Sequence, residues 1–109
     1  MPRFIITGNY TSAAMKGMIA NPSDREASTR PLVEAAGAKL ESYFLTSGDN
    51  DFMMVVEGPD SADIVPALMV AGASGTVSNL KTIRAYTSAE FTAAQKKAGQ
   101  LVAQFKPAG

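Results

Sequence analysis

Five polar side chains in or beside the expected strands are the candidates for binding or chemistry: Asn9, Tyr10, Tyr43, Asp51 and Arg84. The Asp51 carboxylate could act as a base or anchor a substrate in a pocket at the end of the sheet. A tyrosine hydroxyl can donate to a ligand or act as an acid, and a guanidinium suits an anionic substrate. These residue types point to a mostly apolar pocket with a few convergent polar groups.

Each candidate also has a structural interpretation, which stays open at this point. Residues 48–51 are a concentrated turn signal, in which Asp side chains commonly bond to backbone amides. Tyr10 and Tyr43 could bury their rings in the core or an interface and leave the hydroxyl at the rim. Arg84 and Lys81 lie on opposite faces of a regular strand, which weakens a joint anion site.

The chain contains no His, Cys or Trp. Without His there is no imidazole base, no Ser-His-Asp triad and no histidine ligand for a metal or haem. Without Cys there is no thiolate nucleophile, disulfide or iron–sulfur cluster. The carboxylates form no acidic cluster at metal-ligand spacing, and Met53 and Met54 point to opposite faces, which disfavours a copper site. We therefore expect no metal and no cofactor.

Charge and hydropathy exclude two further classes of partner. Ten Lys and Arg residues offset ten Asp and Glu residues, so the surplus cations that a nucleic-acid binder needs are missing. The first residues do not resemble a signal peptide, and no uncharged apolar run approaches the roughly 20 residues that span a bilayer. We expect neither a nucleic acid nor a membrane as partner, and a cytoplasmic location.

Strands are expected where β-branched and aromatic residues cluster between turn signals, at residues 3–10, 38–46, 51–57 and 75–86. A short helix should follow the first strand and stop at Asn21-Pro22. Ser23 with Glu26 has the pattern of a capping box, which predicts a second helix running to about residue 36, with Pro31 bending it or delaying its start. A third helix is expected over residues 61–73. A second capping box predicts a strongly amphipathic last helix over residues 88–105.

This order of elements predicts an α+β fold: a ferredoxin-like βαββαβ unit with an extra C-terminal helix and a four-stranded antiparallel sheet. We expect one domain over residues 1–109, with a core at about residues 3–87. The first and third strands should be central, and both are apolar on both faces. Because helices can cover only one face, the other needs a cover. A second copy of the same face is the simplest one, so we expect a homodimer or higher oligomer.

Several short motifs, in order along the chain, resemble the GYD-domain family of small bacterial proteins. They include Asn21-Pro22-Ser23-Asp24-Arg25, Arg30-Pro31-Leu32-Val33-Glu34, Tyr43-Phe44-Leu45-Thr46, Glu57-Gly58-Pro59-Asp60 and Ala73-Ser74-Gly75-Thr76-Val77-Ser78, and the resemblance spans about residues 4–90. It implies a dimeric α+β barrel and brings no catalytic residues. The family's Gly-x-Tyr-Asp reads Gly48-Asp49-Asn50-Asp51 here, so any role of that tyrosine is in doubt, while Asn keeps the turn.

Three functions remain open. The first is a small oligomeric protein that binds a small molecule between sheet and helices without catalysis. The second is an oxygenase or isomerase that acts without a cofactor on small aromatic or lactone substrates, in which Asp51 or a tyrosine would replace the missing His. The third is a purely structural oligomerisation module. Of these we expect binding rather than catalysis.

Overall fold

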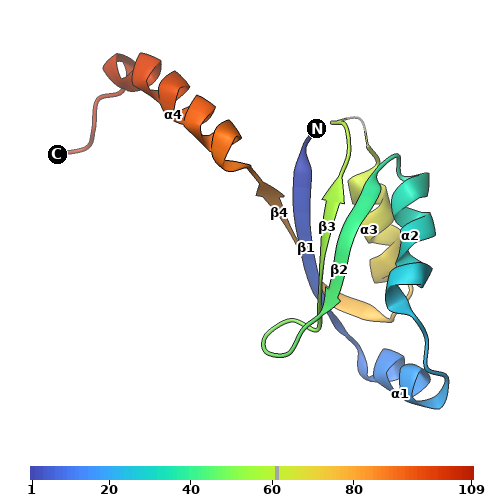
Figure 1. The fold of residues 1–109 in the computed structure, drawn as a ribbon. Helices are drawn as coiled ribbons and strands as arrows, with labels where there is room; N and C mark the ends of the chain where they lie inside the picture. The colour runs from blue at the N-terminus through green and yellow to red at the C-terminus, as the bar shows by residue number, and fades with distance from the viewer. Residues whose placement is uncertain (61) are drawn as a thin grey trace.

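The computed structural model describes residues 1–60 and 62–109, and its elements follow the expected order (Figure 1). They are β1 (Arg3–Tyr10), α1 (Ser12–Ala20), α2 (Arg25–Ala35), β2 (Lys39–Leu45), β3 (Phe52–Glu57), α3 (Ile64–Ala73), β4 (Val77–Ala85), α4 (Ser88–Leu101) and a 3₁₀ turn, η1 (Val102–Gln104). Ser61, where the third helix was expected to begin, lies outside the described residues.

The four strands form one antiparallel sheet in the order β2-β3-β1-β4. The first and third strands are therefore central, as the sequence predicted. This is the α+β arrangement of a ferredoxin-like fold with an additional C-terminal helix.

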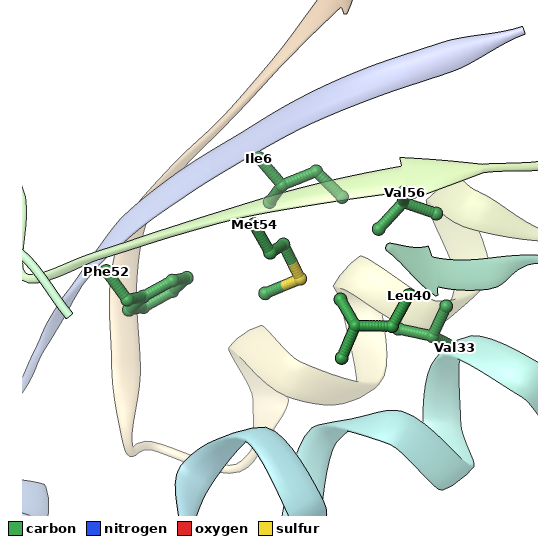
Figure 2. Packing of buried hydrophobic residues seen from close by; sticks show 6 residues of the cluster. All are labelled: Ile6, Val33, Leu40, Phe52, Met54 and Val56. Carbon is green, nitrogen blue, oxygen red and sulfur yellow. The ribbon is translucent and has the colours of Figure 1, made fainter. Parts of the chain in front are cut away.

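Helices α2 and α3 lie on the same side of the sheet (Figure 1) and cover its buried face. Figure 2 shows Ile6, Phe52 and Met54 pointing from the central strands toward these helices. The most completely buried side chains are Leu40, at 2% exposure, and Val56, at 0%. The core is thus a single apolar layer between the sheet and two helices.

The opposite face of the sheet is also apolar, which confirms the prediction made from the central strands. The register places Ile5 opposite both Val55 and Ile83 on this face. On the edge strands, Ile83 and Phe44 remain 55% and 57% exposed. We call the patch formed by Ile5, Phe44, Met53, Val55 and Ile83 the open face.

The start of α2 corrects one prediction. The N-cap is Asp24 rather than Ser23, because Asp24 Oδ1 accepts from the backbone N–H of Ala27 at 3.1 Å. Glu26 therefore cannot complete a capping box, and its carboxylate instead accepts from Arg30, four residues along the helix, at 2.7 Å. Pro31 lies inside α2 and neither delays its start nor ends it.

The last helix begins as predicted. Thr87 and Glu90 form a reciprocal capping box, with each side chain accepting from the other residue's backbone N–H. No residue of α4 is buried, and the helix runs away from α2 and α3 beyond the end of β4 (Figure 1).

Candidate functional site

Two tyrosines from non-adjacent strands meet above the central strand β3. Tyr10 ends β1 and Tyr43 lies in β2, yet their hydroxyl oxygens are 2.8 Å apart. The ring of Phe52, on β3 between them, supports both: its centroid lies 5.2 Å from that of Tyr10 and 6.2 Å from that of Tyr43. The three rings form an aromatic wall that ends in a pair of hydroxyls.

The environment of Tyr43 keeps its phenol protonated. Burial raises its pKa above the ordinary value, and the hydrogen bond with Tyr10 acts in the same direction. At neutral pH the Tyr43 hydroxyl can therefore donate to a ligand, but it is not a general base.

An open cavity of about 280 Å³ lies between the sheet and helices α2 and α3, and both tyrosines line it. Most of its wall is apolar, formed by core side chains of the sheet and by the inner sides of the two helices, among them Ile6, Met54, Leu32, Leu68 and Leu80. Its volume is near the lower end of the range for small-molecule sites. Ligands of modest size fit such a space.

Polar groups of α2 also line the cavity. Arg25, Ser28 and Thr29 contribute from the first turns of the helix. Arg25 donates to Ser23 Oγ at 3.3 Å and forms no salt bridge with any described residue. A half-buried cation without a carboxylate partner beside an apolar wall suits an anionic group on a ligand.

Asp51 and Asn9 lie next to Tyr10 but do not line the cavity. Asp51 Oδ2 accepts from the backbone N–H of Tyr10 at 2.8 Å and from Asn9 Nδ2 at 3.4 Å. Asn9 Nδ2 also donates to the backbone oxygen of Asp49, and Asn9 Oδ1 accepts from Asn79, both at 3.0 Å. These contacts are the ones expected of a carboxylate that holds a turn in place.

Asn50, at the position of the family's tyrosine, sits in the same turn. Its backbone oxygen accepts from Thr46 Oγ1 at 2.6 Å, which closes the turn. Its side-chain nitrogen is buried and has no hydrogen-bond partner among the described residues.

Arg84 lies elsewhere, at the end of β4 where α4 begins. Its guanidinium is 4.4 Å from the centre of the Tyr86 ring and 3.8 Å from the Glu90 carboxylate. The structure thus brings four of the five candidates to one end of the sheet and puts the fifth at the base of α4.

The contribution of α2 to the cavity was not predicted from the sequence. Arg25 stands in a charged first turn, Asp24-Arg25-Glu26, of the kind that usually faces solvent. The signal that could have found it is the helical spacing from Arg25 through Thr29 and Leu32 to Ala36, which places it on the inward side of α2.

Residues 1–60 and 62–109 contain neither a metal-binding cluster nor a helix that could cross a membrane. No three His, Cys, Asp or Glu side chains come together there as a metal-binding group. No helix in that part of the chain is long and apolar enough to cross a membrane.

Comparison with known proteins places the chain in a family. A search of curated proteins found no match. A family model of the GYD domain matches residues 4–94, which is most of the chain and includes Tyr10, Tyr43 and all of the sheet except Arg3 at the start of β1. The resemblance seen in the short motifs is confirmed, and the chain belongs to the GYD domain family.

Proposed function

We propose that the protein binds a small, largely apolar molecule in the cavity between the sheet and helices α2 and α3. The observation that carries the proposal is a cavity of about 280 Å³ whose apolar wall ends in the paired hydroxyls of Tyr10 and Tyr43. A purely structural module has no need of such a space, since cores normally close to high packing density.

The polar groups on the wall indicate the ligand's chemistry. A flat, aromatic body matches the ring wall around Phe52, and an anionic group matches Arg25. Because one molecule of liquid water takes about 30 Å³, the cavity holds on the order of ten non-hydrogen atoms. A small aromatic carboxylate meets all three conditions.

Neither candidate base is placed for catalysis in the cavity. Asp51 lies outside its lining and is bonded to a backbone amide, and Tyr43 holds its proton. The arrangement therefore supports binding more than the oxygenase or isomerase alternative.

Titration calorimetry with benzoate and its neutral analogue benzamide tests the proposal. We expect saturable binding of benzoate, weakened about tenfold or more in Arg25→Gln because a charge-assisted hydrogen bond is lost. Benzamide affinity should change little in that variant. The matched control Lys16→Gln, on the exposed side of α1, should leave both affinities unchanged. The site would be refuted if neither probe bound saturably. It would also be refuted if Arg25→Gln bound benzoate as tightly as the wild-type protein does.

Self-association through the open face is the second part of the proposal. The patch of Ile5, Phe44, Met53, Val55 and Ile83 is what a two-fold interface needs, because one apolar surface then covers itself. The sheet faces of two copies would form the dimeric α+β barrel that the family resemblance implies.

A further inference from the structure

The C-terminal segment, α4 with the 3₁₀ turn η1 and the residue after it, carries a row of large apolar side chains that the described residues leave exposed. Phe91 and Leu101 lie on α4 at 58% and 53% exposure. Val102 begins η1 at 70% exposure and Phe105 follows η1 at 74%, and we call the four residues the α4 stripe. Amphipathic helices gain most of their stability by packing such a stripe, and a helix of this length is marginal alone in water.

The joint between β4 and α4 holds the helix in a set direction. Only Tyr86 and Thr87 separate the two elements. Thr87 is held by both bonds of the capping box, at 2.8 and 3.1 Å. Arg84 braces the joint from the strand, stacking on Tyr86 and pairing with Glu90. The helix cannot fold back onto its own sheet without breaking these contacts.

The chain is consequently elongated. Its extents are 60 × 33 × 23 Å and its radius of gyration is 17.7 Å, against about 13 Å for a compact chain of this length. In Figure 1, α4 runs outward from the end of β4, away from α2 and α3. An isolated copy therefore leaves the whole α4 stripe in water.

We propose that α4 is an exchanged arm, whose stripe packs on the body of a second copy of this chain while that copy's α4 packs on the first. We name a second copy as the partner because the open face is continuous with the base of the arm. Ile83 of the open face lies on β4, five residues before α4 begins. A copy that packs on the open face therefore lies beside the start of α4.

The area is sufficient for a stable contact. Each side chain of the α4 stripe removes on the order of 100 Å² from water when covered. Two exchanged arms with the surfaces they cover then reach roughly the 1,600 Å² of a stable protein interface. Lys96 lies on the other side of the helix and stays in solvent, while Lys97 borders the stripe one turn before Leu101.

The inference rests on the proposed self-association and is independent of the cavity. Because the chain has no Trp, Phe91→Trp introduces a single fluorescent reporter in the stripe. The matched control is Gln100→Trp, nine positions along and therefore on the opposite side of the helix. Both full-length variants are diluted while their mass is followed by light scattering.

We expect the Phe91→Trp emission to be blue-shifted in the dimer and to move to the red over the dilution range in which the mass falls to that of a monomer. The control should emit in the red throughout. A dimer with red emission at position 91 would overturn the arm while leaving the open-face contact standing. A monomer at every concentration would overturn both. Blue emission from a monomer would show that α4 docks on its own chain, which also overturns the arm.

A second pair of variants gives the energetic test. Phe91→Asp should raise the concentration at which the dimer dissociates about 100-fold or more, since both arms lose a buried aromatic. Gln100→Asp should leave it unchanged. No α4 side chain is buried in the single chain, so both variants should keep the fold by circular dichroism. An unchanged dissociation concentration in Phe91→Asp would overturn the proposal.

Discussion

Asp51 joins the turn between β2 and β3 to the end of β1. Its carboxylate accepts from the Tyr10 backbone, and its own backbone N–H donates to the oxygen of Gly8 at 2.9 Å. Bonds to a charged acceptor are about twice as strong as neutral ones. At the scale of the residue, the importance of Asp51 thus lies in stability.

We predict that Asp51→Asn destabilises the protein by about 1–2 kcal/mol, because a charge-assisted bond to the Tyr10 amide becomes a neutral one. Asp49→Asn, in the same turn, serves as the control and should change the unfolding free energy by less than about 0.5 kcal/mol, since no hydrogen bond of its side chain is found among the described contacts. Urea denaturation measures both. Equal effects would contradict the anchoring role.

The tyrosine pair makes a prediction about pH. Because the pKa of Tyr43 is raised in the folded protein, its neutral form contributes stability that is fully present below the unfolded pKa of about 10. That contribution is lost as pH rises from there through the folded pKa.

The unfolding free energy should therefore fall above about pH 10, and Tyr43→Phe should fall less steeply. Titration of phenolate absorbance should show one tyrosine ionising above the others in the native protein and in Tyr86→Phe, but not in Tyr43→Phe. If Tyr43→Phe retained that late component, the raised pKa would belong to another residue.

At the scale of the element, β1 passes so close to its neighbours that one position has no room for a side chain. A Cβ built on Gly8 would lie 2.6 Å from Phe52 Cζ and 2.9 Å from Leu80 Cδ2. Phe52 belongs to the buried core at 3% exposure, and Leu80 is a partly buried side chain packed against that core. The glycine therefore lets the aromatic wall of the cavity lie against the strand.

We expect Gly8→Ala to destabilise the protein by about 1–3 kcal/mol through overpacking and to weaken benzoate binding by displacing Phe52. Gly17→Ala in α1 is the contrasting change, because a Cβ there would meet nothing within 4 Å. It should stabilise the helix by up to about 1 kcal/mol. Thermal unfolding checks both signs, and a stabilising Gly8→Ala would be inconsistent with the close approach.

At the scale of the whole molecule, stability depends on what covers the open face. Its central strands are apolar on both sides, which a sheet with one solvated face avoids. Ile83 lies on the edge strand β4 of this face, opposite Ile5 on the central strand β1. A second copy would remove these side chains from water in both partners at once.

We predict that the protein is a dimer at micromolar concentration by light scattering and that Ile83→Asp makes it a monomer, because two carboxylates would be buried in the interface. Ile19→Asp is the control: Ile19 is 81% exposed on α1, away from the open face, so this variant should stay dimeric. A monomeric wild-type protein would rule out the open-face contact.

The candidate site was only partly predictable. Both tyrosines were identified from their strands, but their meeting depends on β3 lying between β1 and β2 with Phe52 beneath them. The role of Asp51 as an anchor was one of two interpretations. The contribution of Arg25 was missed because a charged first turn usually faces water, and only the helical spacing from Arg25 to Thr29 and Leu32 indicates the side of the cavity.

The sequence by itself determined the order of the elements, the two central strands and the amphipathic last helix, because strand, helix and turn preferences act between near neighbours in the chain. Only the tertiary structure decided which polar groups converge and where α4 points. Those outcomes depend on strand register and on packing between residues that are far apart in sequence, such as Tyr10 with Tyr43. For the five chemical candidates, that packing separated Arg84 from the other four.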